Sequence, residues 1–219
     1  MRSTALSLFT LPLILAVKSA NSESSSSCQH LLERFSATTE AEDQQHQDLV
    51  LQYRQLLCLL AKRMKIGEEV ALSKWQSKKA IFDPVRERAI LAASVAKASH
   101  YGLDKQWLTT FFANQMRASC LVQEHMFSLW KSNHHNLTSA PHVDLIGTIR
   151  PQLDTINAQL VELAKKTISL RGSEQCKSLT TSLQPSVNKE LKFDGEEVEI
   201  YRQYALRDLC LVVTLQSKH

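Results

Sequence analysis

Basic side chains interrupt the apolar stripes of the first half of the chain, where a helical bundle would have its interior. Arg63 follows Leu60 by three residues and Lys74 follows Arg63 by eleven, so both lie on one face if the helix is continuous. Arg86 lies on the apolar face of the next segment. Buried cations without matching acids need an anionic ligand to offset the loss of hydration. Because two guanidinium groups can each bind one carboxylate, the spacing predicts a pocket for a small dianion.

Ser119 and Gln123 extend this pattern, because they lie four residues apart in an otherwise apolar stripe. Each residue alone has an ordinary explanation, since Ser and Gln are usually solvated and a long basic side chain can reach the surface from an apolar face. Together with Glu87, the acid beside Arg86, these side chains point from three segments toward one interior. The pattern indicates a site that binds charge and stabilises it.

Covalent and metal chemistry are not predicted. No His lies at helical spacing from Ser119, and no two cysteines have the C-x-x-C spacing of zinc or redox sites. We therefore expect no metal. Four histidines are interpreted as surface residues rather than ligands: His100, His134, His135 and His142.

Helices must position these residues, because 219 residues contain only 5 Gly and 5 Pro, too few for a turn-rich β fold. The expected fold class is all-α, a bundle of long antiparallel helices with a C-terminal helical pair. Gly67 is the point at which the first helix could break. The helices are predicted at 40–78, from Pro84 to Gly102 with Asp83 as N-cap, from Asp104 to Trp130, at 144–170, at 173–183 and at 194–214.

The N-terminus resembles an export signal. Arg2 precedes an apolar run from Leu6 to Val17, which is too short to span a membrane. We assign residues 1–22 to a signal peptide and 23–39 to a polar leader, so the protein is expected to be secreted, either extracellular or periplasmic. The mature chain is then nearly neutral, which argues against a nucleic-acid partner, and no membrane association is expected.

Secretion favours a disulfide. Of the five cysteines, Cys176 and Cys210 flank the last predicted helical pair, and closing this loop would contribute roughly 3.5–4 kcal/mol. An odd number leaves at least one cysteine unpaired, and the fates of Cys28, Cys58 and Cys120 stay open. Asn136 begins the sequon Asn-Leu-Thr and is a candidate glycosylation site.

Four stretches of the chain carry a family resemblance: Ala61-Lys62-Arg63-Met64, Val70-Ala71-Leu72-Ser73-Lys74-Trp75, Ile81-Phe82-Asp83-Pro84-Val85-Arg86-Glu87 and the run from Phe111 to Ser119. They resemble the all-helical chorismate mutases, and the export signal and the long second half resemble their secreted subtype. The resemblance covers roughly residues 45–215, within a predicted domain at 40–219 whose catalytic first half is 40–132 and whose second half is 144–215.

The resemblance implies that the protein rearranges chorismate to prephenate without a cofactor. Arg63 and Arg86 would bind the substrate carboxylates, and Lys74 and Gln123 would donate hydrogen bonds to the ether oxygen whose bond breaks. Glu87 and the Asp83 backbone would hold the ring hydroxyl, and Ser119 would assist at a carboxylate. Some relatives have Glu where this chain has Gln123, and an amide donates at any pH.

One departure from the family pattern concerns the second half. The secreted subtype supplies a further Arg there, and Gln159 stands at the position we match to it. Lys165 or Lys166 would have to replace the missing charge. The alternative function is therefore a catalytically inactive secreted helical protein that keeps the scaffold and binds another protein. The subtype also implies a homodimer in which each chain forms its own site.

Overall fold

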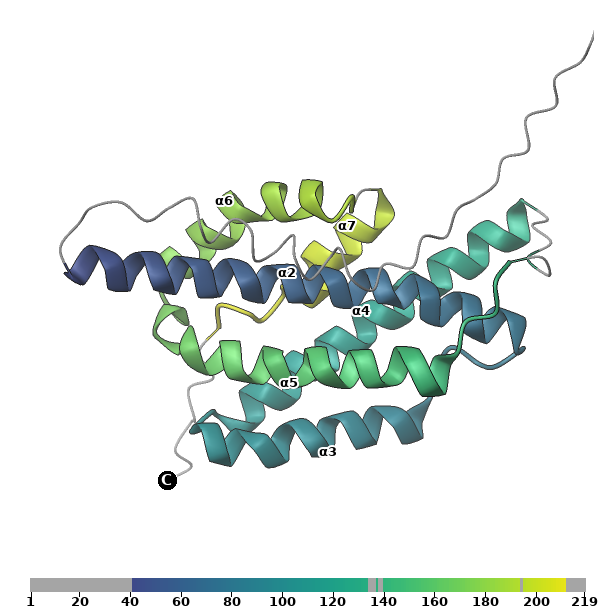
Figure 1. Cartoon of the computed structure of the whole chain (residues 1–219), viewed down its shortest axis with the longest axis horizontal. Helices are drawn as coiled ribbons and strands as arrows, with labels where there is room; N and C mark the ends of the chain where they lie inside the picture. Colours follow the sequence, from purple (N-terminus) through teal and green to yellow (C-terminus); the bar gives the residue numbers. More distant parts are fainter. Residues whose placement is uncertain (1–40, 134–136, 138–139, 194, 212–219) are drawn as a thin grey trace, which may run out of the picture.

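The computed structural model describes residues 41–133, 137, 140–193 and 195–211, and every regular element within them is helical (Figure 1). This is the all-α class that the sequence predicts. The α-helices are α2 (Ala41–Gln76), α3 (Pro84–Tyr101), α4 (Lys105–Ser132), α5 (Arg150–Lys166), α6 (Glu174–Glu190) and α7 (Glu196–Ile200). No helix in the described ranges is both long enough and apolar enough to cross a bilayer.

The long helix α2 is the centre of the bundle and packs against α4, α5 and α6. Its apolar stripe is buried as predicted, with Tyr53, Leu56 and Leu60 almost inaccessible to solvent. Gly67 does not break the helix. It faces α4, and a Cβ at Gly67 would lie at ordinary contact distances, 3.5 Å from Val122 and 3.6 Å from the Ser119 hydroxyl. Arg63 and Lys74 therefore belong to one continuous helix.

The starts of α3 and α4 follow the predicted capping residues. The Asp83 side chain accepts a hydrogen bond from the Arg86 backbone N–H at 3.0 Å, and Pro84 occupies the first turn. Asp104 accepts from the Trp107 backbone N–H at 2.6 Å. Gly102 ends α3 with φ of 62°, a left-handed conformation that glycine adopts without steric cost. These caps fix the position of Arg86 at the first turn of α3.

The predicted helix at 144–170 is divided into three parts. Its first turn, Leu145–Ile149, is a π-helix in which the Arg150 N–H bonds the Leu145 carbonyl, and α5 begins only at Arg150. The physical reason is Pro151, which has no N–H to donate within an α-helical ladder. After α5 a single 3₁₀ turn spans Ile168–Leu170.

The C-terminal pair also differs in its bounds from the prediction. Helix α6 continues through Pro185 to Glu190, and the last helix is short, with α7 followed by a π-helical turn at Tyr201–Ala205. A disulfide joins Cys176 to Cys210, the pair that the sequence favours, with a Cα–Cα distance of 5.7 Å. Cys58 is buried and Cys120 partly buried, both as thiols. The predicted signal peptide, Cys28 and Asn136 lie outside the described residues.

Candidate active site

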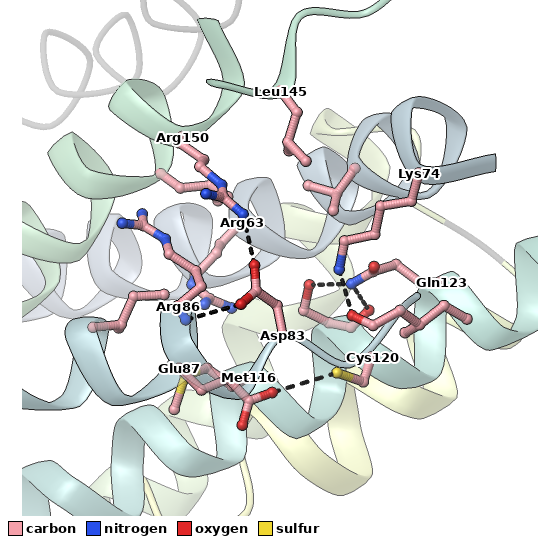
Figure 2. Close-up of a pocket in the computed structure, with 15 residues that line it drawn as sticks. Arg63, Lys74, Asp83, Arg86, Glu87, Met116, Cys120, Gln123, Leu145 and Arg150 are labelled. Carbon is pink, nitrogen blue, oxygen red and sulfur yellow. Dashed lines mark hydrogen bonds and ion pairs between the residues drawn. The ribbon is translucent and has the colours of Figure 1, made fainter. Parts of the chain in front are cut away.

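A pocket of about 70 Å³ opens where α2, α3 and α4 meet the beginning of α5 (Figure 2). It collects side chains from residue 63 to residue 153, so no single segment could form it. Seven of the eight catalytic and substrate-binding residues predicted from the sequence line it: Arg63, Lys74, Asp83, Arg86, Glu87, Ser119 and Gln123.

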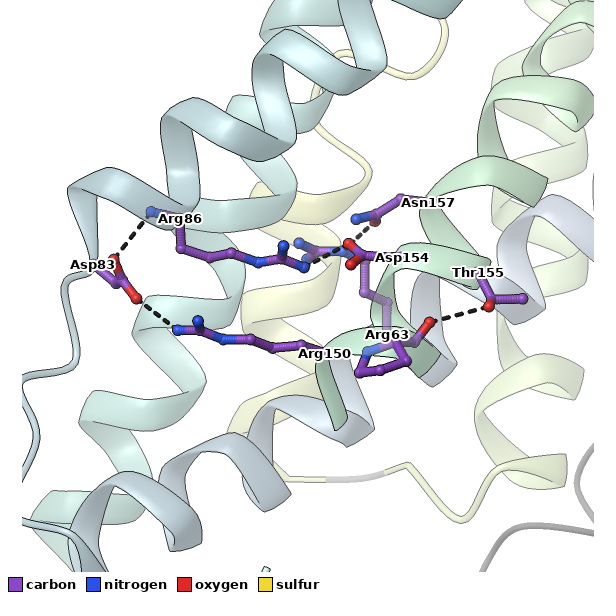
Figure 3. A network of polar contacts seen from close by, with 8 residues as sticks. Arg63, Asp83, Arg86, Arg150, Asp154, Thr155 and Asn157 are labelled. Carbon is purple, nitrogen blue, oxygen red and sulfur yellow. Dashed lines mark hydrogen bonds and ion pairs between the residues drawn. The ribbon is translucent and has the colours of Figure 1, made fainter. Parts of the chain in front are cut away.

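Arg63 is buried without an acidic partner in the described part of the chain, since its side chain is only 3% exposed. Its Nε donates to the Asn157 side-chain oxygen at 3.1 Å (Figure 3). One terminal nitrogen donates to the Gln115 backbone carbonyl at 2.7 Å. Burial lowers the pKa of Arg63 to about 10, although the guanidinium stays charged at neutral pH. A buried charge held only by neutral groups favours an anionic ligand.

Lys74 lies on the same side of α2 and is 7% exposed. Its ammonium group donates to the Ile81 carbonyl in the loop before α3. Burial is the main cause that lowers the pKa of Lys74, with nearby acids opposing the shift. Because an ammonium group has three donors and this bond uses one, Lys74 can also donate to a ligand in the pocket.

Arg86 and Arg150 form the second cationic group of the site, and each is bound to a carboxylate (Figure 3). Arg86 pairs with Asp154 at 2.5 Å, and Arg150 pairs with Asp83 at 2.7 Å. The backbone hydrogen bond from Arg86 is the largest cause that lowers the pKa of Asp83, and the charge of Arg150 adds to it. The loop before α3 and the start of α5 are thereby tied together at the pocket mouth.

Hydrogen-bonding groups from α4 form the floor of the pocket. The Gln123 amide nitrogen donates to the Ser119 carbonyl at 2.9 Å and lies 3.2 Å from the Ser119 hydroxyl. The Gln123 carbonyl oxygen is buried and has no hydrogen-bond partner within the described residues. Cys120 lies 3.8 Å from a Glu87 carboxylate oxygen, and burial raises the pKa of its thiol. At neutral pH this thiol is therefore protonated and is not a nucleophile.

Gln159 is the predicted site residue that does not line the pocket. It is exposed, because the buried face of α5 is formed by residues on the opposite side, such as Asn157 and Leu160. The two lysines considered as substitutes do not reach the pocket either: Lys165 lies near Gly102, and Lys166 pairs with Glu162 at 2.7 Å.

Arg150 is the residue that the sequence interpretation missed. It lines the pocket from the first turn of α5, so the second half does supply a cation to the site. The observation that motivated an inactive scaffold, the loss of this charge, therefore does not hold. Arg150, Asp154 and Asn157 follow one another at steps of four and three, a helical face that could have been recognised.

The charge of the pocket matches a dianion. Its lining holds four basic side chains, Arg63, Lys74, Arg86 and Arg150, against two acidic ones, Asp83 and Glu87, which leaves an excess of two positive charges. A low-dielectric pocket strengthens the attraction between these groups and a bound anion. Fixed donors in such a pocket can also stabilise negative charge that develops during a reaction.

Comparisons with known proteins identify relatives of one kind. The family described as "Chorismate mutase type II" matches residues 54–124. The chain is 28% identical over 154 residues to a secreted chorismate mutase of Mycolicibacterium smegmatis, covering 68% of this chain and 81% of the relative. It is 26% identical over 125 residues to a secreted chorismate mutase of Mycobacterium tuberculosis, covering 57% of this chain and 62% of the relative.

Solved structures give the same result for the fold. The crystal structure of a chorismate mutase from Burkholderia thailandensis superposes with a TM-score of 0.68 at 29% identity, covering 73% of this chain and 99% of that one. A chorismate mutase from Burkholderia phymatum gives a TM-score of 0.69 at 26% identity, covering 75% and 99%. The similarity thus extends over nearly the whole length of both structures and over both halves of the bundle.

Proposed function

The chain belongs to the all-helical chorismate mutases, and we propose that its pocket rearranges chorismate to prephenate. The observation that carries this proposal is the excess of two positive charges in a pocket that includes a buried arginine with only neutral partners. Chorismate is a dicarboxylate, so its two negative charges offset this excess. The reaction is an intramolecular isomerisation, which requires no second substrate.

Three arginines would bind the two carboxylates. Arg63 offers a guanidinium already fixed by Asn157 and Gln115, so one carboxylate would meet a preorganised partner. Arg86 and Arg150 already hold the carboxylates of Asp154 and Asp83, and a substrate carboxylate would take over part of these contacts. Binding both ends of the substrate holds it in the compact conformer from which the rearrangement proceeds.

Lys74 and Gln123 would stabilise the transition state. The ether oxygen gains negative charge as its bond to carbon breaks, and donors aimed at that oxygen lower the barrier. Lys74 has unused donors, and the Gln123 amide nitrogen can exchange its bonds to Ser119 for one to the substrate. Glu87 and the Asp83 backbone would hold the ring hydroxyl, and Ser119 would assist at a carboxylate.

The biological setting is proposed from the relatives. Two of them are named secreted chorismate mutases, which supports export of this chain with removal of residues 1–22. Expression of the full-length chain in a bacterial host, followed by N-terminal sequencing of the exported protein, would locate the cleavage point. We also propose a homodimer, which sedimentation of the mature protein would test.

The activity can be tested by following chorismate with the mature protein, without added metal or cofactor, and identifying the product by NMR. We expect prephenate as the product. Arg150→Met should weaken chorismate binding by roughly 1.5–3 kcal/mol, because a charge-assisted hydrogen bond is lost. The matched control is Arg202→Met, which removes an exposed arginine that pairs with Glu199 on α7. Equal effects of the two variants would contradict the assignment of Arg150.

A further inference from the structure

A second cavity lies between α3 and α5, on the other side of Arg86 from the catalytic pocket. Its volume is about 320 Å³, larger than that of the catalytic pocket. It shares Arg86 and Ile90 with that pocket, and its other lining residues are separate from it. We call it the α3–α5 cavity; its lining is Arg86, Ala89, Ile90, Ala93, Ser94, Lys97, Asp154, Asn157, Ala158 and Val161.

Three side chains in the lining of this cavity carry donors without a partner among the described residues. Ser94 is 4% exposed and Asn157 is 7% exposed. Within the described residues the Ser94 hydroxyl has no hydrogen-bond partner, and Asn157 uses only its oxygen, which accepts from Arg63. Lys97 is exposed at the edge of the cavity and forms no ion pair with the described residues. Ser94 and Asn157 are buried residues, and the polar groups of such residues are normally satisfied, so these two donors at the cavity wall indicate a ligand that accepts.

The charge and shape of the cavity define the class of ligand. Arg86 is shared with the catalytic pocket and pairs with Asp154, so Lys97 is the only basic residue in the lining that belongs to this cavity alone. A single carboxylate could accept from Ser94 and Asn157 and would balance the charge of Lys97. Alanines, Ile90 and Val161 form the rest of the wall, which suits an apolar body.

We propose that the α3–α5 cavity binds a small monocarboxylate with an apolar body, and that this ligand competes with the substrate for Arg86. Arg86 lies in the wall between the two cavities and pairs with Asp154, which lines only the α3–α5 cavity (Figure 3). Asn157 also holds Arg63. A carboxylate in this cavity would also attract the Arg86 guanidinium, which lines the same wall, and would hold it on this side, away from the substrate. The binding step is independent of the proposed function, whereas the competition rests on it.

Calorimetric titration with 3-phenylpropanoate tests the binding step. The mature protein should bind this probe, and the uncharged 3-phenylpropanamide should bind at least about tenfold more weakly, because it lacks the charge. Lys97→Met and Ala158→Leu should each weaken binding of the carboxylate at least about tenfold, the first by removing a charge and the second by filling the cavity. Lys105→Met is the matched control, since Lys105 is an exposed lysine on α4 outside the cavity, and it should leave binding unchanged.

Two outcomes of the titration would overturn the proposal. One is no binding of 3-phenylpropanoate at millimolar concentration. The other is equal binding by the wild type, Lys97→Met and Ala158→Leu, which would place the probe in the catalytic pocket instead.

Kinetics test the competition separately. In the wild type, saturating 3-phenylpropanoate should raise KM for chorismate severalfold with kcat unchanged, and Lys97→Met should lose this response while keeping its basal activity. If the probe binds at the cavity but KM does not change, the coupling through Arg86 is wrong. If the protein has no activity on chorismate, the calorimetric result still decides whether the cavity is a site.

Discussion

The catalytic pocket and the disulfide corner both bury polar side chains against α2, but one keeps them charged and the other keeps them neutral. We define the disulfide corner as Tyr53, Thr180, Cys176 and Cys210. There the Tyr53 hydroxyl lies 2.5 Å from the Thr180 hydroxyl and 3.2 Å from the Cys176 sulfur. Burial raises the pKa of Tyr53 to about 12, so the corner carries no charge at neutral pH.

The catalytic pocket, in contrast, keeps its buried side chains charged. Arg63 and Lys74 are as buried as core residues, yet each is bonded to neutral groups, and burial lowers the pKa of both. Burial removes the hydration of these charges, and no acidic partner offsets that loss, so they destabilise the unliganded fold. The comparison teaches that the corner contributes stability, whereas the pocket retains cations for a ligand. Substitutions in the two regions should therefore affect different measurements.

The largest effect on stability is expected in the corner. The double variant Cys176→Ser, Cys210→Ser should lower the free energy of unfolding by roughly 3.5–4 kcal/mol, because the cross-link closes a loop of 34 residues. Its kcat/KM at 25 °C should equal that of the wild type, since the disulfide does not line the pocket. Denaturant unfolding measures the change in stability, and steady-state kinetics measures kcat/KM. A large loss of activity in a fully folded sample would break the separation of the two regions.

At Lys74 we expect a large loss of activity with little change in stability. Lys74→Met should lower kcat about 10²–10³-fold, the usual effect of removing one donor to a developing oxyanion. The free energy of unfolding should change by less than about 1 kcal/mol, because the variant also removes a poorly hydrated buried charge. A fall in stability comparable to that of the disulfide variant would mean that Lys74 is a structural residue.

A smaller effect, dependent on pH, is expected at Gln123. An amide donates at any pH, so wild-type activity should persist through neutral pH. Gln123→Glu should lose at least about tenfold in kcat at pH 8 and recover as the pH falls, because a carboxyl group donates only when protonated. The pH profile of kcat measures this, and full activity of the variant at pH 8 would contradict the role of Gln123.

The smallest effect is expected at Asp83. Its carboxylate caps α3 and pairs with Arg150, and its pKa is lowered below the ordinary value of 3.8. Stability from this group is therefore present above about pH 4 and is lost as the pH falls through the lowered pKa. Asp83→Ala should cost about 1 kcal/mol at pH 7, and Asp83→Asn less, because Asn also caps helices. Thermal unfolding of both variants at pH 7 and at pH 2 tests this, and a cost that persists at pH 2 would exclude the charge as its cause.

Much of the fold and of the site could be predicted because the evidence is local. Caps such as Asp83 and Asp104 act on the backbone three residues away, and the stripe of α2 places Arg63 and Lys74 on one face. The all-helical class and seven pocket residues follow from such patterns together with the family resemblance.

The helical spacing of Arg150, Asp154 and Asn157 is visible in the sequence, but the place of Arg150 in the pocket is not. Its place depends on the π-helical turn before Pro151, which sets the rotation of α5 against α2 and α3. A continuous helix from residue 144 hides this shift, and the pair of Arg150 with Asp83 joins residues 67 positions apart. When the additional Arg of the family is aligned without this rotation of α5, the matching residue is Gln159, which is exposed.

The most direct test of the pocket is the rate of chorismate loss, followed by its ultraviolet absorbance, for the wild type and Arg63→Met at pH 7. Arg63 is the cation with the fewest charges to balance it, so its removal should lower kcat/KM at least about 10²-fold, the effect of losing a preorganised charged contact. The account predicts rapid loss of absorbance with the wild type and near-background loss with the variant. A wild-type rate no greater than the uncatalysed rate, or equal rates for the two proteins, would contradict it.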